Sequence, residues 1–590
     1  MAHALRGMAA LQRLAGQTHR AAMKSVSTHP IGCHLNGASG ARRSRRFDSP
    51  CGSGRGFSST VLSWMLKRAE ARAPATGQTS RHQFPVLLVT HIFAVLVMGT
   101  SASPGGERFD LRQFGAVGDG RVKDTMAIQK AIGAAAAAGG GTVVFPPGTY
   151  LSGSIQLRSR VTLHLDKGAT LLGSPHRSDY RKLNFYALVW ADNATDIGIS
   201  GAGVIDGQGK KLAVGYELPV TQGKWPDARE AERPVIINFR NCRNITVRDI
   251  TLRESACWVQ LYRDCDDVLI ENIKVRTMAA ITNDGLDLDG CKNVVVRGCD
   301  IDSEDDGICL KSTRRACENI LIENCRVRSS CNALKFGTAS FVGFKNIICR
   351  KLEIYDTYLS AIALELVDGG LMENVVVADV KITDTSNPIF IRLGHRNSDG
   401  PVGTLRNVTL SNITAVIPDR PRSAMNKFPT AWRHRCLTLV TASITGVPGH
   451  PVRDVTLKDI SILYGGIGGQ AQTNHHRWDN LAAVPERADS YPESTMFGVL
   501  PAWGFYLRHA EGIRFENITL QVKAKDYRPA LVADDVRNLL LDGVRVPSAG
   551  SEPVLVFKDV TGATITNSAP PPKAVRFLKA IGNTSDITGP

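Results

Sequence analysis

Acidic residues are scarce at the start of this chain of 590 residues. Residues 1–103 contain 13 Lys and Arg but only two acids, Asp48 and Glu70, so they carry +11 of the total charge of +16. The remaining residues carry only +5. Because the basic excess belongs to a leader and not to one face of a folded domain, the charge distribution argues against a nucleic-acid partner.

Cysteine pairs of the CxxC type are absent, and no two His residues have the spacing of metal ligands on a helix; His475 and His476 are adjacent. We therefore expect neither a zinc site nor a cofactor. Of the 13 Cys, two lie in the leader, and the odd remainder leaves at least one thiol unpaired. Cys299 and Cys325 occupy positions at which neighbouring repeats carry Ile or Leu, so we expect them to pack as core residues.

Long apolar runs are missing, apart from residues 84–98. That run has the length of a signal-peptide core and is too short to span a bilayer comfortably. Arg81 and His82 precede it, and small residues follow at 100–103, as at a signal cleavage site. We expect residues 1–103 to be a secretory leader that is otherwise disordered, and the protein to be secreted or periplasmic without stable membrane insertion.

The leader is longer than a secretory signal requires, because about 80 residues precede its apolar run. One explanation is a start codon assigned too early, with Met65 as the true start. The other is an organellar transit peptide, since the segment is rich in Arg and Ser and poor in acids. We favour the first.

One short phrase recurs through the rest of the chain, whose low aromatic content of 6% and 55 Gly residues favour many turns. The phrase is Asn or Asp followed by alternating apolar residues. It begins at Asn244, Asp267, Asn293, Asn319, Asn346, Asn374, Asn407, Asp454, Gly512 and Asn538. Alternation with period two predicts strands with one buried face, and a repeat of about 20–30 residues predicts a solenoid whose coils stack. A second strand follows in each unit, as at residues 285–289 and 307–311.

The pattern is the signature of a parallel β-helix, and we predict an all-β fold with a single catalytic domain over residues 104–590. The repeated Asn can hydrogen-bond its own turn and its copy one coil away. An amphipathic helix from Asp124 to Ala138, with Asp124 as N-cap and Gly139–Gly141 as its end, would cover the N-terminal coil. Long spacings near 416–453 and 464–511 indicate inserted loops, and the second contains Tyr491 and Trp503. Such insertions often build the binding face.

Three acids stand out against the repeat. Asp284 opens the second strand of one coil, and Asp305 and Asp306 open that of the next, about one repeat later. Adjacent coils lie about 4.8 Å apart, so these carboxyl groups should crowd together, which raises some pKa values and suits a protonated acid beside an ionised base. That pairing is what glycosidic-bond hydrolysis requires. Turn capping by Asp and a Ca²⁺ site are the alternatives.

The same residues carry a resemblance to a known family. Residues 109–120 look like the N-terminal motif of pectin-active β-helix proteins, and Thr282-Asn283-Asp284-Gly285 followed by Asp305-Asp306 resembles polygalacturonases of glycoside hydrolase family 28. The resemblance covers roughly residues 108–565. It implies a right-handed parallel β-helix that hydrolyses a pectic or related acidic polysaccharide with inversion. It also implies Asp305 as general acid, with Asp284 and Asp306 holding and deprotonating the attacking water.

Two positions depart from the family pattern. Ser330-Cys331-Asn332 stands in place of the family's Gly-His-Gly, and Ala361-Ile-Ala363 stands in place of the Arg-Ile-Lys that grips the sugar carboxylate. This leaves open another pectic unit, such as one of rhamnogalacturonan. As substrate-binding residues we predict Lys311, Lys335, Asn332, Glu365, Arg392 and His395.

Aromatic residues could add to the site, because sugar rings present apolar faces. Trp225, Trp258 and Tyr262 could stack on a sugar, and core packing is the alternative for Trp258. We expect a monomer whose partner is a polysaccharide. Two other functions remain open: a polysaccharide lyase on the same fold, and a glycan-binding β-helix without catalysis.

Overall fold

The computed structural model describes residues 106–212, 232–419, 440–466, 477–547, 553–571 and 576–589, all within the unit Arg81–Pro590. The predicted leader with its apolar run and Met65, together with Trp225, His475 and His476, lies outside the described residues. Within the described ranges, no helix combines the length and apolar character that a membrane crossing requires.

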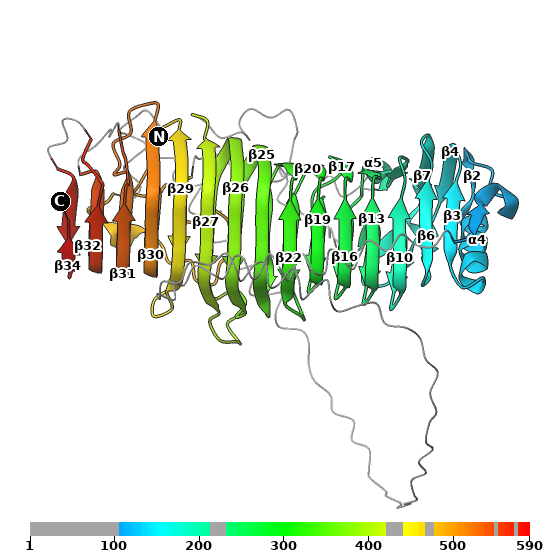
Figure 1. Ribbon diagram of the computed structural model, residues 1–590, viewed down its shortest axis with the longest axis horizontal. Helices are drawn as coiled ribbons and strands as arrows, with labels where there is room; N and C mark the ends of the chain where they lie inside the picture. Colours follow the sequence, from blue (N-terminus) through cyan, green and yellow to red (C-terminus); the bar gives the residue numbers. More distant parts are fainter. Residues whose placement is uncertain are drawn as a thin grey trace, which may run out of the picture. The chain divides into compact units, whose positions relative to one another are not determined.

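The described strands stack into an elongated parallel β-helix (Figure 1). Each coil contributes one strand to each of three parallel sheets in turn, and each strand pairs with its counterparts one coil before and after. The confirmed solenoid buries its apolar residues along the axis, because no coil can cover its own inner face.

The short strands belong to one sheet each. Sheet 1 contains β1 (Arg108–Asp110), β3 (Gly141–Phe145), β6 (Val161–Leu165), β10 (Thr195–Ser200), β13 (Arg243–Arg248), β16 (Asp266–Glu271), β19 (Lys292–Arg297), β22 (Cys317–Glu323) and, at the far end, β34 (Ser585–Thr588). Sheet 2 contains β2 (Asp119–Lys123), β4 (Gly148–Ser152), β7 (Ala169–Gly173), β11 (Val204–Asp206), β14 (Thr251–Arg253), β17 (Lys274–Thr277), β20 (Asp300–Ser303) and β23 (Arg326–Ser329). Sheet 3 contains β5 (Ile155–Gln156), β9 (Tyr186–Asp192), β12 (Val235–Arg240), β15 (Gln260–Arg263), β18 (Leu286–Asp289), β21 (Ile308–Ser312), β24 (Leu334–Ser340), β28 (Ala442–Thr445) and β33 (Leu578–Ile581).

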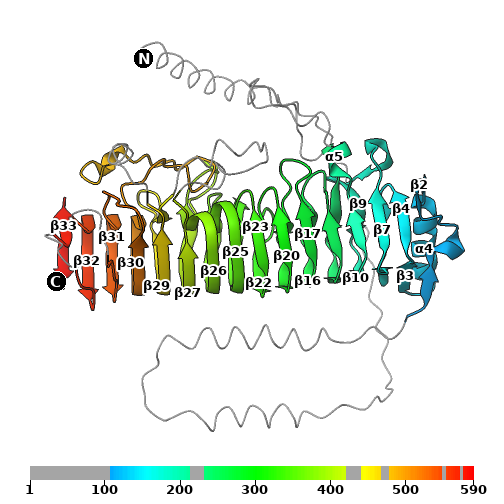
Figure 2. The same ribbon diagram turned by 90° about the horizontal axis from the view of Figure 1, so that it is seen from above.

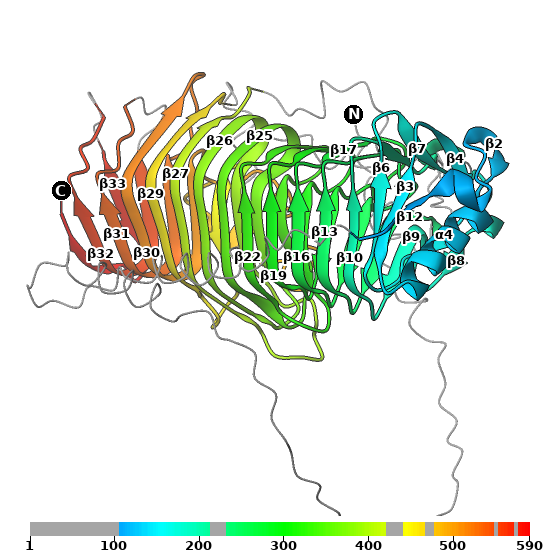
Figure 3. The ribbon, with the colours of Figure 1, turned by 45° about the vertical axis from the view of Figure 1, so that its right-hand side comes forward.

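Later strands bend around the corners and join more than one sheet, as Figure 3 shows for β25 to β27. They are β25 (Gly343–Leu366), β26 (Leu371–Leu393), β27 (Thr404–Val416), β29 (Val452–Tyr464), β30 (Phe505–Val522), β31 (Leu531–Asp542) and β32 (Leu555–Thr566). The short β8 (Arg181–Lys182) pairs antiparallel with β9. Short helices η1 (Leu111–Phe114), η2 (Arg177–Asp179), α5 (Gly209–Leu212) and η8 (Leu481–Ala483) lie between strands.

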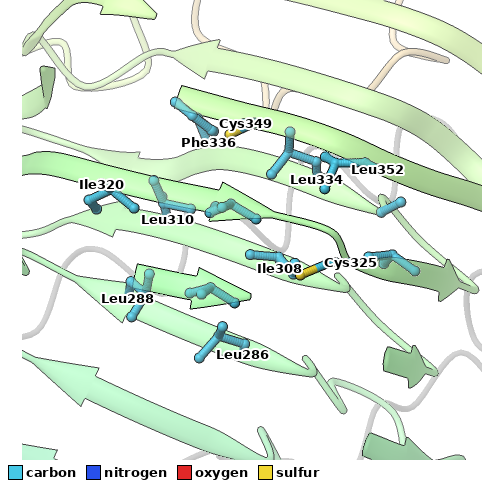
Figure 4. Close-up of a cluster of buried hydrophobic side chains, with 14 of the residues drawn as sticks. Leu286, Leu288, Ile308, Leu310, Ile320, Cys325, Leu334, Phe336, Cys349 and Leu352 are labelled. Atoms are coloured by element: carbon cyan, nitrogen blue, oxygen red, sulfur yellow. The ribbon is translucent and has the colours of Figure 1, made fainter. Parts of the chain in front are cut away.

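The core consists of columns of like side chains that run from coil to coil. In sheet 3, Leu286, Ile308 and Leu334 share one inward position, while Leu288 and Leu310 share the next (Figure 4). All are fully or almost fully buried. Cys299 and Cys325 are buried in the same core, as predicted, and the ten described Cys are all buried free thiols. The alternation of apolar and polar residues with period two therefore determines both where a strand forms and which of its faces is buried.

The recurring Asn residues form the predicted ladder. Asn319 Nδ2 donates to Asn293 Oδ1 at 3.2 Å, and Asn346 Nδ2 donates to Asn319 Oδ1 at 3.2 Å. Each of these residues has a positive φ between 56° and 57°. Asn tolerates this left-handed backbone better than other side chains, and its amide both donates and accepts, so one residue type meets both requirements of the turn.

The predicted N-terminal cap is α4 (Thr125–Ala137), which packs on β1, β3, β5 and β6 at one end of the stack (Figure 1). Its inward face consists of Ala and Ile. Asp124 precedes the helix, but its carboxylate accepts from the backbone N–H groups of Val117 and Gly118 instead of capping α4. Gly139, with φ of 90°, follows the C-cap Ala138.

One inserted stretch follows β29 and precedes β30 in the sequence, and in Figure 2 it lies along a long side of the stack. We call residues 477–504 the covering segment. Its apolar residues Leu481, Val484, Phe497 and Leu500 pack on the outer face of sheet 3. The residues beneath are Ala363, Phe390, Tyr506, Val532 and Val556. The outward position that these residues share is therefore mostly apolar under the segment, with Ser443 between Phe390 and Tyr506 as its polar member.

Candidate active site

The three predicted acids meet where the chain turns from sheet 2 into sheet 3. Asp284 precedes β18, and Asp305 and Asp306 precede β21 on the next coil. The Gly after each acid motif is required by close packing: a Cβ on Gly285 would lie 2.6 Å from the Gly307 carbonyl oxygen. The two turns thus stack almost backbone on backbone, and their carboxyl groups are brought together.

Asn283 fixes the first of these turns. Its Oδ1 accepts hydrogen bonds from the Thr277 hydroxyl and from the N–H groups of Ala279 and Ala280. Its Nδ2 donates to the carbonyl oxygens of Ser255 and Cys257 on the preceding coil. With its side chain fully used in this way, Asn283 positions the neighbouring Asp284 instead of facing a ligand.

A pocket of about 290 Å³ opens over these acids. It is lined by Trp258, Thr282, Asp284, Asp305, Asp306, Lys311, Cys331, Thr338, Ala339, Arg396, Tyr491 and Glu493. Asp284, Asp305 and Asp306 keep only 4–7% of their surface exposed. The site therefore combines largely dehydrated carboxyl groups with an opening for a small ligand such as one sugar ring.

Asp306 is the acid whose ionised form is stabilised most strongly by its neighbours. Its Oδ2 lies 3.1 Å from Lys335 Nζ, and its Oδ1 accepts hydrogen bonds from the side chain and backbone N–H of Asn332 at 3.0 and 3.2 Å. Burial alone would raise the pKa of Asp306, but Lys335, Lys311 and the Asn332 hydrogen bond outweigh it and lower that pKa. Asp306 is therefore ionised.

Asp305, its neighbour, titrates at a higher pH. Burial and the adjacent Asp306 charge raise the pKa of Asp305 to about 7. The Asp305 carbonyl oxygen accepts hydrogen bonds from the Ser303 and Ser329 hydroxyls, which fix the backbone of the turn. A carboxyl group that keeps its proton up to about pH 7 lies beside one that does not, which is the arrangement that acid–base chemistry requires.

Asp284 shares a cation with a second carboxylate. Lys311 Nζ lies 3.1 Å from Asp284 Oδ2 and 2.5 Å from Asp287 Oδ1, so its ammonium stands between the two acids. Burial and the Asp287 charge raise the pKa of Asp284. The ammonium also lies 4.7 Å from the ring centroid of Trp258, a half-buried residue of the pocket wall.

The structure places the predicted binding residues in different environments. Lys335 and Asn332 are buried directly behind the pocket, and Glu365 is fully buried, 3.9 Å from Lys335 Nζ. Arg392 is 1% exposed and does not line the pocket: its guanidinium donates to the carbonyl oxygens of Gly446, Glu486 and Arg487. The His395 ring contacts the Gly400 carbonyl and is likewise not part of the lining.

Arg392 and His395 therefore stabilise loops instead of contacting a ligand. Arg392 bonds to backbone carbonyls of the covering segment, and the His395 ring bonds to the carbonyl of Gly400, since buried carbonyl groups require hydrogen-bond donors. Of the aromatic candidates, Trp258 lines the pocket. Tyr262 is fully buried, and its hydroxyl donates to Gln260, so it is a core residue.

Sequence reasoning did not predict Thr338, Ala339, Arg396 or Glu493 as site residues, and it named Tyr491 only as part of an inserted loop. Arg396 forms a two-point ion pair with Asp368, and Tyr491, which is 49% exposed, lies over both Arg396 and Lys335. Glu493 is 7% exposed. Tyr491 and Glu493 both lie in the predicted insertion at 464–511, which was the one signal in the sequence for either residue.

Comparison with known proteins identifies the family. The family model "Glycosyl hydrolases family 28" matches residues 141–477, more than half of the chain. The chain belongs to this family. The match includes Asp284, Asp305 and Asp306 and ends before Tyr491 and Glu493.

Curated relatives agree with that assignment. A probable polygalacturonase of Vitis vinifera is 27% identical over 307 residues, which cover 48% of this chain and 56% of the relative. An exo-poly-alpha-D-galacturonosidase of Dickeya chrysanthemi is 24% identical over 380 residues, which cover 52% of this chain and 63% of the relative. The chain thus spans less than two thirds of either relative.

A solved structure shares the fold. The exopolygalacturonase of Thermotoga maritima superposes with a TM-score of 0.52 at 22% identity, over 64% of this chain and 92% of the other. The architecture is the right-handed parallel β-helix that the resemblance implied.

Proposed function

We propose that the protein is an inverting glycoside hydrolase that cleaves glycosidic bonds in a pectic polysaccharide. The observation that carries this proposal is the pair Asp305 and Asp306 in one pocket, the first with a pKa of about 7 and the second with a lowered pKa. Membership of family 28 and the polygalacturonase names of the curated relatives support the substrate class.

The reaction uses the two protonation states directly. Asp305 donates its proton to the glycosidic oxygen while the bond between that oxygen and the sugar's anomeric carbon breaks. A water molecule attacks the anomeric carbon from the opposite side and loses a proton to Asp306. Asp284 holds that water, and Lys335 and Asn332 keep Asp306 ionised for its role as base. The products are a new hydroxyl group and a new reducing end.

We propose further that the protein is secreted and meets its polysaccharide outside the cell. The signal-like run at residues 84–98 and family membership support this. Detection of the native protein in culture medium, with a mature terminus near residue 103, would test it. A protein retained inside the cell at full length would contradict it.

Product analysis tests the activity. The purified protein is incubated with pectic fractions, and products are followed by reducing-end assay, ultraviolet absorbance and proton NMR of the new anomer. We expect new reducing ends of inverted configuration without unsaturated sugars. Ultraviolet-absorbing products would identify a lyase, and binding without any product would identify a glycan-binding protein.

A further inference from the structure

The covering segment enters the pocket at the boundary between a polar and an apolar part of sheet 3. Successive coils carry Asp287, Cys309, Lys335, Ala363 and Phe390 at the same outward position. The first three contribute polar groups beside the acids, whereas Ala363 and Phe390 lie under the segment. Ala363 stands where the family resemblance places a carboxylate-binding Lys. The change to Ala therefore supplies the apolar surface on which this segment docks.

Two further contacts determine where the segment enters the pocket. The Arg392 guanidinium donates to the carbonyl oxygens of Glu486 and Arg487, and the His395 N–H donates to that of Ala488. A few residues later, the chain places Tyr491 and Glu493 in the pocket wall. Residues beyond the end of the family match thus supply two of the groups that line the pocket.

Glu493 is held in place on this wall. Its Oε1 lies 3.7 Å from Lys335 Nζ, and its Oε2 accepts a hydrogen bond of 3.4 Å from Asn332 Nδ2. The same Lys and Asn contact Asp306. Glu493 therefore adds a fourth acid to Asp284, Asp305 and Asp306 in the pocket lining.

The cations of the pocket are already paired with carboxylates. Of the described residues that line it, Lys311 and Arg396 are the cations, and Lys311 is shared between Asp284 and Asp287. Arg396 is engaged by both oxygens of Asp368. Lys335, behind the wall, lies among Asp306, Glu365 and Glu493. A uronate carboxylate in this pocket would add a negative charge with no uncommitted cation among these residues to receive it.

We propose that the sugar residue held in this pocket is neutral, and that Glu493 excludes a uronate there. The inference rests on the proposed function and specifies which unit of a pectic chain is attacked. A carboxylate accepts hydrogen bonds from the hydroxyl groups of a neutral sugar, and it repels the carboxylate of a uronate at the same place. Tyr491, half-exposed over Arg396 and Lys335, offers a ring face to the same sugar.

The position of the cut bond tests the proposal directly. The substrate is an oligosaccharide in which neutral and uronate residues alternate, and the residue at each new reducing end identifies which sugar reacted. We expect a neutral residue there. A uronate at the new reducing end would overturn the proposal while leaving the glycosidase function intact.

Glu493→Gln provides the second measurement. The substrates are an oligogalacturonate and its carboxyl-reduced counterpart, which differ only in the charged group. We expect the ratio of kcat/KM for the charged over the neutral substrate to rise at least tenfold in E493Q. Asp479→Asn, which makes the same change of charge on the exposed part of the covering segment, should leave the ratio within twofold of wild type. An unchanged ratio in a folded E493Q would remove Glu493 from specificity.

Binding decides the case in which no substrate is cleaved, an outcome that would contradict the proposed function. Calorimetry of the wild-type protein with the same two oligosaccharides and with the alternating one then measures selectivity without turnover. Tighter binding of ligands with an accessible neutral residue supports the inference. Tighter or equal binding of the oligogalacturonate, or binding of none, overturns it.

Discussion

Asp306 and Lys335 lie one coil apart and form a buried ion pair, with 3.1 Å between Oδ2 and Nζ. Lys335 is 1% exposed, and Glu365 and Glu493 lie within 4 Å of the same ammonium. Burial opposes the charged ammonium, but Asp306 and Glu365 outweigh burial and raise the pKa of Lys335. One cation therefore links the turn that carries Asp305 and Asp306, the following coil of sheet 3 and the covering segment.

We predict that Lys335→Met destabilises the protein by about 3–5 kcal/mol, because it leaves buried carboxylates without their cation. The free energy of unfolding in urea measures the effect. Glu365 is the most isolated partner, since neither of its oxygens receives a hydrogen bond from the described residues. The double variant K335M/E365Q should therefore recover part of the loss. A cost below about 1 kcal/mol for K335M would show that the pair contributes little to stability.

Replacing Asp305, the proposed general acid, should impair turnover and spare the fold. We predict that Asp305→Asn lowers kcat by about 10²–10⁴-fold, because the amide cannot donate a proton to the leaving oxygen. Oligosaccharide binding and the unfolding midpoint should stay close to wild type. Asp399→Asn, the same substitution at an exposed turn, is the control and should keep full activity. Activity of D305N within threefold of wild type would exclude Asp305 as the acid.

The rate should depend on pH in a defined direction. In its proposed role as acid, Asp305 has to be protonated, and its pKa is about 7, so kcat/KM should fall as the pH rises through about 7. Because the lowered pKa of Asp306 leaves the base ionised, the rate should persist well into the acidic range. A pH–rate profile between pH 4 and 9 measures both limits. A rate that rises between pH 6 and 8 would contradict the assignment.

The same shift affects stability. Asp305 has a higher pKa in the folded protein than the value of about 3.9 expected in the unfolded chain. Its contribution is therefore fully present below about pH 4 and is lost as the pH rises through about 7. Relative to D305N, the wild type should lose stability over that interval. Urea unfolding of both proteins at pH 4, 6 and 8 provides the measurement, and a constant difference would show that Asp305 titrates normally.

The Asn ladder can be tested at one rung. Asn319→Ala removes the bonds to Asn293 and Asn346 and places Ala at a φ of 57°, so we predict a loss of about 1–3 kcal/mol. Asn319→Gly loses the same bonds without the backbone strain and should cost less. The difference between the two variants in urea unfolding measures the backbone strain less the extra unfolded-state entropy of Gly. An Asn319→Ala variant more stable than Asn319→Gly would show that strain at this φ is not the larger effect.

Much of this arrangement follows from local sequence rules. Alternation with period two determines which residues face the axis, and the spacing of the repeat determines which residues share a column, so Asp284, Asp305 and Asp306 could be placed together from sequence. The cap helix α4 was predictable for a similar reason, since its Ala and Ile residues recur at helical spacing.

The covering segment was not predictable in this way. Nothing in the spacing of an insertion specifies the coil on which it folds back, so Glu493 gave no sign that it would reach Asn332, which lies 161 positions earlier. The same gap explains Arg392, which the sequence analysis predicted as a substrate-binding residue. That position is covered by the segment, and its guanidinium bonds to backbone carbonyls. Tertiary packing of an irregular chain determined both cases.

The ten free thiols buried in the described part of the chain affect how the protein must be handled. They are protected only as long as the coils stay stacked, and unfolding would release them together into solvent, where thiolates oxidise and cross-link chains. Heating in air should therefore give aggregates that cannot refold, with an apparent melting temperature that depends on the scan rate. A reducing agent should restore reversibility without changing the native activity.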